Sequence, residues 1–447
     1  MIGGSLSKWT MSYFAIAIAW LIAAEALMAA GFGFPATDLG SPDTLVVVHM
    51  VCIGWLSLAM CGALFQFVPV LVAKPLFAES WELPSLGLLT TGLGALLAGF
   101  LALSGRLPNW LWLLPLAAAF LVAGFGLVAA NLGLTVWRAR PPIGPAHFVL
   151  AGLGSLCATA ALGSMFAWAL AGYGGSPFAT LLAYGIPLHA TAGLGGWLTL
   201  TAMGVSYRLL SMFMLSPDVD GRRSRTTLLA GSAAIGITVA GGLLAIATDL
   251  GVNVVLASAA ALGLVALALY GRDISELYRR RKRQQLELNM KMAACGFASL
   301  AGSTLLGLSL AVTGSFAAHA GAFAFLVAFG WLSGLVLAKL YKIVAFLTWL
   351  ETYGPAMGRA PTPRVQDLVA ERRAVKWFSI YFASVWIGTA ALLCGQASTF
   401  RFAALAMAVA TIGIVQELIR TRRLTDVAEP LRLPSGTTAP RLLYSRT

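Results

Sequence analysis

The sequence predicts an all-α polytopic membrane protein with twelve transmembrane helices, and three observations lead to this fold class. Of its 447 residues, 59% are hydrophobic and only 11% are charged, against about 25% charged in an ordinary soluble domain. Twelve apolar stretches are each long enough to cross the hydrocarbon core, and one pattern recurs three times along the chain. The composition excludes a soluble enzyme, a disordered protein and a nucleic-acid-binding protein, because the net charge of +13 belongs to loops between apolar stretches.

The expected spans are stretches of about 18 or more residues that are almost free of charge, the length a helix needs to cross a bilayer. The first carries Glu25 and is longer than a signal-peptide core, so we expect it to be retained. The longest segments between spans are a basic loop over 272–291 and a loop over 353–373, too short for a separate domain. We therefore expect a single membrane domain over 1–447, with a cytoplasmic tail over 420–447. The twelve spans cover about 9–32, 44–72, 82–104, 109–137, 144–172, 180–214, 226–248, 252–271, 290–313, 317–349, 374–395 and 399–419.

The distribution of Lys and Arg predicts that both termini are cytoplasmic. Twelve is an even number of spans, so both ends of the chain lie on one side of the membrane. On the opposite side the loops carry only Arg106 and Arg401, whereas the basic clusters, including the run 279–283, lie on the side of the termini. Basic loops remain in the cytoplasm. We interpret the run 279–283 as a topology signal, with contact to anionic lipid headgroups as the alternative.

A repeated pattern divides the spans into three groups of four. Trp55, Trp197 and Trp331 stand in spans two, six and ten, each followed by Leu and then by Ser or Thr. The repeat units cover about 9–137, 144–271 and 290–419, which predicts three four-helix arcs related by a pseudo-threefold axis. Each Trp is followed by a small residue seven positions later and an aromatic residue ten positions later, namely Gly62 and Phe65, Gly204 and Tyr207, and Ala338 and Tyr341.

Three of the four histidines, His49, His189 and His319, precede the repeated Trp residues. Because a repeat unit contains an even number of spans, we expect all three near the same face of the membrane. A histidine within a membrane commonly binds a metal or haem iron; the alternative is a hydrogen bond to a neighbouring carbonyl or hydroxyl group. The fourth, His147, stands at the cytoplasmic entry to span five, and we interpret it as an interfacial residue.

These features resemble the catalytic subunit of the haem-copper oxidases and its divergent relatives in the nitric-oxide response. The resemblance covers nearly the whole chain in topology, although its sequence motifs are short. It implies that His49 and His319 hold a low-spin haem b between spans two and ten. In the family a second histidine, two positions before the one matched by His319, binds a high-spin haem; here that position is Ala317.

Two further departures concern the family's copper site. His189 matches its histidine in span six, but the adjacent His-His pair is absent, and the position of its tyrosine is Gly193. We therefore do not expect a complete terminal oxidase, and whether the chain is a redox enzyme stays open. What the resemblance retains is a bis-histidine haem site, with His189 as a copper ligand or second site.

The depth of the two haem ligands depends on how it is counted. Counted from the shared Trp, His49 lies six residues upstream and His319 lies twelve, an offset of about 9 Å along a helix. Counted from the outer ends of the spans at Asp43 and Ser315, they come within two residues of one level. We favour the second measure.

Three further residues are candidates for the haem environment. The resemblance implies that a basic residue between spans eleven and twelve serves the haem propionates, which makes Arg401 the first candidate and Arg106 a weaker one. Glu25 is a candidate proton-transfer group or hydrogen-bond partner of a ligand histidine. The alternative for Glu25 is a protonated carboxyl bonded within the bundle.

These expectations describe a non-covalent haem-b protein for electron transfer or nitric-oxide or redox response. We expect a multi-pass protein of a bacterial-type cytoplasmic (inner) membrane, whose partners are the lipid bilayer and a redox protein or quinol. A membrane transporter is one alternative, although transporter repeats usually form two halves. A copper-handling protein, in which His49, His189 and His319 bind one metal ion, is the other.

Overall fold

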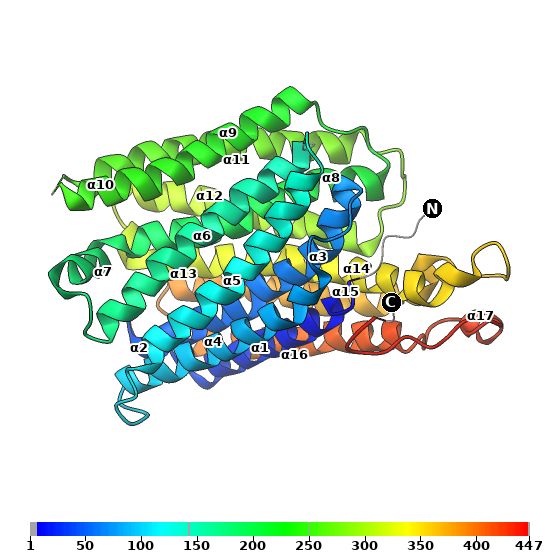
Figure 1. Cartoon of the computed structure of the whole chain (residues 1–447), viewed down its shortest axis with the longest axis horizontal. Helices are drawn as coiled ribbons and strands as arrows, with labels where there is room; N and C mark the ends of the chain where they lie inside the picture. The colour runs from blue at the N-terminus through cyan, green and yellow to red at the C-terminus, as the bar shows by residue number, and fades with distance from the viewer. Residues whose placement is uncertain (1–6, 142–143, 249, 446–447) are drawn as a thin grey trace. The chain divides into compact units, whose positions relative to one another are not determined.

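The computed structural model describes residues 7–141, 144–248 and 250–445, and all regular elements in these ranges are helical (Figure 1). Each of the twelve apolar stretches expected from the sequence falls in a helix. Eleven helices in the described ranges are long and apolar enough to cross a membrane. The expected sixth span is a continuous helical run over 175–214 but is not one of the eleven. The protein is therefore a polytopic helical membrane protein, and the count of twelve spans stays a prediction.

The chain forms two compact units. The first combines the expected spans one and two with spans nine to twelve, and the second contains spans three to eight, so the units do not follow the repeat boundaries. The single membrane domain over 1–447 stays a prediction.

The first unit (Met1–Gln66 and Leu286–Thr447) contains α1 (Thr10–Ala30), α2 (Pro42–His49), η1 (Met50–Ser57), the first part of α3 (Leu58–Val72), α12 (Leu288–Val312), α13 (Phe316–Phe325), η5 (Leu326–Ser333), α14 (Gly334–Tyr353), η6 (Gly354–Ala356), η7 (Val365–Leu368), α15 (Glu371–Leu393), α16 (Ala397–Arg422) and α17 (Glu429–Arg432). The second unit (Phe67–Gln285) contains the rest of α3, η2 (Glu79–Trp81), α4 (Glu82–Leu103), α5 (Leu113–Arg138), α6 (Gly144–Leu170), α7 (Gly175–Ala190), η3 (Thr191–Leu200), α8 (Thr201–Met214), α9 (Gly221–Gly236), η4 (Ile237–Gly241), α10 (Gly242–Ala247) and α11 (Val252–Arg279).

Each of the three histidine-bearing helical runs contains a long π-helical segment. The segments η1, η3 and η5 have 8, 10 and 8 residues, and each contains the repeated Trp. All three Trp side chains are buried. A shorter π-helix, η4, lies in the run expected as span seven. Because π-helical residues are rare in proteins and frequently mark functional sites, the three long segments single out these helices.

The glycine of the repeat makes the same close contact in its first two copies. A methyl group at Gly62 would lie 2.7 Å from Cβ of Tyr13 in α1. A methyl group at Gly204 would lie 2.3 Å from Cβ of Phe148 in α6. In both copies the Trp-bearing run therefore packs tightly on the span that precedes it in the chain.

The aromatic position of the repeat shows where the third copy differs. Phe65 and Tyr207 each pack with the ring of the preceding span, at centroid distances of 5.5 Å in both cases. Tyr341 instead packs at 5.8 Å on Phe378 of the following span, α15. Ala338 takes the place of the glycine in this copy. The repeated sequence pattern is therefore accompanied by the same packing on the preceding span in the first two copies. The arrangement of the spans in three four-helix arcs stays a prediction.

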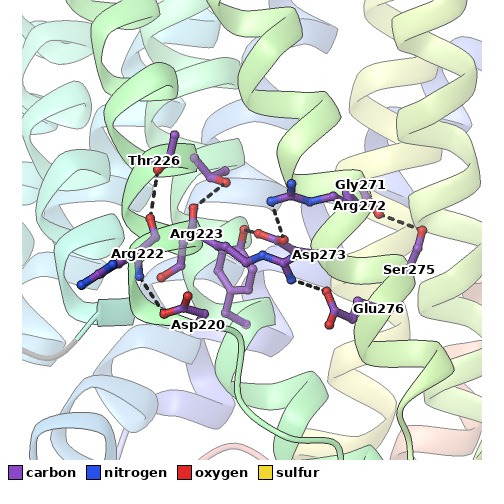
Figure 2. Close-up of polar contacts among 12 residues, drawn as sticks. Asp220, Arg222, Arg223, Thr226, Gly271, Arg272, Asp273, Ser275 and Glu276 are labelled. Atoms are coloured by element: carbon purple, nitrogen blue, oxygen red, sulfur yellow. Dashed lines mark hydrogen bonds and ion pairs between the residues drawn. The ribbon is translucent and has the colours of Figure 1, made fainter.

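The basic loop expected over 272–291 is shorter than predicted, because α11 continues to Arg279 and α12 begins at Leu288. Figure 2 shows contacts made by Asp273 and Glu276, which lie in these extra turns. Asp273 is buried and accepts a hydrogen bond of 3.0 Å from the hydroxyl of Tyr207. Glu276 pairs with Arg223 of α9 and with Arg280, the residue directly after α11. Contacts with α8 and α9 therefore keep a polar segment helical.

The two ends of the described chain lie together in the first unit. The backbone N–H of Ser445 donates to the carbonyl of Lys8 at 3.0 Å. The rings of Trp9 and Tyr444 lie 6.1 Å apart. The expected tail over 420–447 is therefore packed along its described part, after α16 ends at Arg422. The side of the membrane on which these ends lie stays a prediction.

Candidate functional site

His49 is the last residue of α2, directly before the π-helical segment η1. Its Nδ1 lies 2.8 Å from the carbonyl oxygen of Leu45, one turn earlier. A carbonyl oxygen only accepts, so Nδ1 carries the proton and the lone pair of the neutral ring is on Nε2. Metal-binding histidines commonly have this tautomer, fixed by the same kind of hydrogen bond. The Leu45 carbonyl therefore fixes the tautomer and the ring orientation of the partly buried His49 side chain.

The loop before α2 contacts both helices that carry the expected haem ligands. Gly33 has a φ of +76°, and a methyl group there would lie 3.2 Å from the carbonyl oxygen of Asp43 in α2. The ring of Phe34 packs on Gly321 of α13, where a methyl group would lie 2.4 Å from Cζ of Phe34. Two consecutive loop residues thus connect the beginning of α2 with α13. Glycine is required at position 33 by both its conformation and this close approach.

His319 lies in the first turn of α13 and is partly buried. Its backbone N–H donates to the carbonyl of Ser315 at 3.3 Å. Within the described ranges its imidazole ring makes no hydrogen bond, unlike that of His49. The residues on either side of it in the chain, 317–318 and 320–321, are all Ala or Gly. On the face of the helix that carries His319, Phe316 stands three residues before it and Phe323 four after it, and their rings pack 5.3 Å apart.

A hydrogen bond joins the two runs. The indole Nε1–H of Trp55 donates to Oγ of Ser333 at 2.8 Å. His49 lies six residues before Trp55 and His319 lies fourteen before Ser333, which for straight parallel helices is an offset of about 12 Å. Figure 1 shows α2 and α13 toward the same end of the first unit. One haem iron can therefore bind both imidazoles only if the two helices are inclined so that His49 and His319 come to the same level.

Arg401 is the fifth residue of α16 and contacts the carboxyl end of α1. Its Nε donates to the carbonyl of Ala29 at 3.1 Å. A methyl group at Gly31, the left-handed residue that ends α1, would lie 3.1 Å from this Nε. A cation at this end of a helix stabilises its unpaired carbonyl groups. Arg401 therefore has a structural contact in addition to any role toward a ligand.

Glu25 is fully buried in α1. Its Oε1 accepts a hydrogen bond of 3.0 Å from the hydroxyl of Thr411 in α16. Its Oε2 is buried and has no hydrogen-bond partner in the described chain. The hydrogen bond that the structure shows for Glu25 therefore goes to a helix of the bundle rather than to a histidine.

The second unit holds His189 in a setting similar to that of His49. His189 lies in the last turn of α7, directly before the π-helical segment η3. Its Nδ1 donates to the carbonyl of Thr159 in α6 at 3.1 Å. Its ring packs edge-on against Phe166 at 5.5 Å and covers Gly163. His189 thus has the same tautomer as His49, although its carbonyl partner lies in another helix.

The remaining two candidates also belong to the second unit. His147 is exposed in the first turn of α6, in keeping with its interpretation as an interfacial residue. Arg106 is exposed in the loop between α4 and α5, and its backbone N–H donates to the carbonyl of Leu101. In the described ranges no group of three or more His, Cys, Asp or Glu side chains is arranged to hold a metal ion.

A buried lysine in the expected tenth span is not among the candidates predicted from the sequence. Lys339 in α14 is 7% exposed, and the contact of its Nζ is the sulfur of Met290 in α12, at 4.0 Å. The signal was available, since a lysine within an apolar stretch is rare and commonly functional. The π-helical segments and the bond between Trp55 and Ser333 were not predicted either, because no local sequence pattern indicates them.

Comparison with known proteins found neither a matching family model nor a matching curated protein. The resemblance to the haem-copper oxidases therefore depends on the residues, spacing and topology described above, and the function it implies is a proposal.

Proposed function

We propose that this protein is an integral membrane haem-b protein for electron transfer or for nitric-oxide or redox response. The observation that carries the proposal is the orientation of His49, whose Nδ1–H is bonded to the Leu45 carbonyl at the junction of α2 and η1. Histidines that ligate iron commonly bond their second ring nitrogen in this way. His319 is the proposed second axial ligand. A bound haem would supply an iron that takes up and releases one electron.

The residues of the first unit fit this group in their donor chemistry. Two imidazoles on separate helices are a common ligand set for a low-spin haem. His49 is held by a backbone carbonyl, whereas the ring of His319 makes no hydrogen bond in the described ranges. Within the part of the chain that the structure describes, Arg401 uses only Nε for a hydrogen bond, which goes to the Ala29 carbonyl. Its terminal nitrogens are the donors we propose for the propionates; Arg106 is the weaker candidate.

Absorption spectroscopy of protein purified from haem-replete cells tests the proposal. We expect a Soret band and a sharp α band on reduction in the wild type, and loss of the low-spin spectrum in His49→Ala and in His319→Ala. His147→Ala is the matched control, because it removes an exposed imidazole from the second unit and leaves both ligands in place. A wild-type protein without a Soret band would rule out the function, and an unchanged spectrum in either ligand variant would rule out that ligand.

A second metal site at His189 is the finer part of the proposal. The observation that favours it is the bond from Nδ1 to the Thr159 carbonyl, which gives this imidazole the same tautomer as that of His49. Copper is the metal that the resemblance implies. Metal analysis should find copper in the wild type and less in His189→Ala, at unchanged haem content. Equal copper content in both proteins contradicts a site at His189.

We further propose a bacterial-type cytoplasmic membrane with both termini inside, and a quinol or redox protein as electron donor. The adjacent chain ends, joined by the bond between Ser445 and Lys8, support an even number of crossings. The basic residues on the side of the termini support their cytoplasmic location.

A further inference from the structure

The hydrogen bond between Trp55 and Ser333 joins the two helical runs that carry the proposed haem ligands. Trp55 lies in η1, six residues after His49, and Ser333 is the last residue of η5, fourteen residues after His319. The distance from Nε1 to Oγ is 2.8 Å, and both side chains are fully buried. Within an apolar bundle no water replaces a lost partner, so this bond is costly to break.

The π-helical conformation of η5 aims the hydroxyl of Ser333 at Trp55. Ser333 Oγ donates to the carbonyl of Ala328, five residues earlier, at 2.7 Å. In an α-helix a serine hydroxyl reaches the carbonyl three or four residues back. The wider turn therefore changes the direction of the hydroxyl, which donates within η5 and accepts from η1. Both its donor and an acceptor lone pair are used.

We propose that Trp55 and Ser333 are a positioning pair that sets the level of the His49 helix against the His319 helix. They do not touch the iron; they determine how the two imidazoles approach it. This inference rests on the proposed haem function. It assigns a role to the repeated Trp-Leu-Ser sequence, which supplies the indole in one copy and the hydroxyl in another.

Three substitutions test the pair through the haem. Trp55→Phe removes the indole N–H and Ser333→Ala removes the hydroxyl. Each should shift the low-spin electron-paramagnetic-resonance g-values, which report imidazole orientation, and weaken haem binding about ten-fold. The double variant should be no worse than the more affected single variant, because both remove one bond. Ser333→Thr should restore the wild-type spectrum, since the equivalent position of the second repeat is Thr199.

Two matched controls remove the same chemical groups elsewhere in the first unit. Ser303 of α12 is buried, and within the described ranges its hydroxyl bonds only to the Leu300 carbonyl of its own helix. The indole of Trp349 donates to the Pro363 carbonyl at 2.6 Å. Ser303→Ala and Trp349→Phe should leave the haem spectrum unchanged. A spectral shift of equal size in these controls would show that the effect comes from general loosening of helix packing. That result would overturn the inference.

A haem-independent measurement separates this inference from the proposed function. Spin labels at Val48 and Phe316, both exposed, report the distance between the two runs in a background without the native cysteines. Ser333→Ala and Trp55→Phe should shift or broaden that distance, and Ser303→Ala should not. If the wild-type protein binds no haem, the proposed function is wrong. The distances between the spin labels still test whether the Trp55–Ser333 bond sets the level of the two helices. Unchanged distances in Trp55→Phe and in any Ser333→Ala that folds would overturn the inference.

Discussion

At the scale of single residues, Glu25 shows how burial determines the chemistry of a side chain. Its carboxyl group is fully buried in α1, with one hydrogen bond, from Thr411, and an Oε2 that has no partner in the described chain. An ionised carboxylate in such a place costs several kcal/mol, on the order of 2 to 4 in a membrane interior, whereas a neutral acid costs far less. We therefore expect Glu25 to be a neutral acid that accepts from Thr411.

Infrared difference spectroscopy on hydrogen–deuterium exchange checks this expectation. The wild type should show the carbonyl stretch of a protonated acid, and Glu25→Gln should lack it. Because glutamine is neutral and similar in size, Glu25→Gln should change the free energy of unfolding by less than about 1 kcal/mol, while Glu25→Ala should lose about 2 kcal/mol or more to the cavity. Thr411→Val should shift the band without removing it. A wild type without the protonated-acid band would contradict the prediction.

Asp426, outside the membrane-spanning helices, links the stability of the packed tail to pH. Burial raises the pKa of its carboxyl group, but hydrogen bonds from Arg373 at 2.7 Å and Arg420 at 2.9 Å lower it, so that the net pKa lies below the ordinary 3.8. A carboxyl group with a lowered pKa stabilises the fold above its unfolded pKa, and this stability is lost as the pH falls through the lower folded value.

The corresponding variant is Asp426→Asn. At pH 7 it should lower the free energy of unfolding by about 1 kcal/mol. Below about pH 4 the free energy of unfolding of the variant should fall less steeply with decreasing pH than that of the wild type. Thermal unfolding between pH 7 and pH 3 measures both effects. Asp367→Asn is the control, because the partner of Asp367 is the exposed Arg364 and exposed ion pairs contribute about 0 to 1 kcal/mol. An Asp426→Asn profile parallel to the wild type would contradict the assignment.

At the scale of elements, the repeated glycine determines how closely a Trp-bearing run approaches the preceding span. Gly204 of α8 packs where a methyl group would lie 2.3 Å from Cβ of Phe148 and 3.1 Å from the carbonyl oxygen of Pro145. Neither atom is the end of a flexible side chain, so α8 must move away from α6 to admit a methyl group. Gly126 of α5 has no atom within 4 Å of the same position.

This difference predicts opposite effects for two identical substitutions. Gly204→Ala should destabilise the protein by about 1 to 3 kcal/mol, because it overpacks the contact between α6 and α8. Gly126→Ala should be neutral or stabilising by up to about 1 kcal/mol, since alanine favours the helix and meets no neighbour. Unfolding of both purified variants in one detergent provides the comparison. Equal stabilities would show that the close approach at Gly204 is not maintained.

At the scale of the whole molecule, the adjacent chain ends and the basic residues make one topological prediction. Single cysteines are introduced at Asn109, in the loop between α4 and α5, and at Ser435, in the packed tail, in a background without the native cysteines; both positions are exposed. An impermeant maleimide should label Asn109→Cys in intact cells, because this loop carries few basic residues. It should label Ser435→Cys only after permeabilisation. Labelling of Ser435→Cys in intact cells would overturn the cytoplasmic location of the termini.

The sequence by itself determined the features that depend on local pattern. Apolar runs located the long apolar helices, eleven of which in the described ranges can cross a membrane, and the Trp spacing revealed a repeat whose glycine contact recurs at Gly62 and Gly204. These predictions succeed because hydrophobic length and periodicity are properties of one stretch of chain.

Only the tertiary structure decided the contacts between distant stretches. The Trp55–Ser333 bond joins residues 278 positions apart, and the Glu25–Thr411 bond joins residues 386 apart. The extension of α11 depends on Tyr207 of α8, and the wider turns of η1, η3 and η5 give no signal in the hydrophobic pattern. Each of these features costs free energy locally, as a buried polar group or a rare helix geometry, and becomes favourable only when a remote partner completes it.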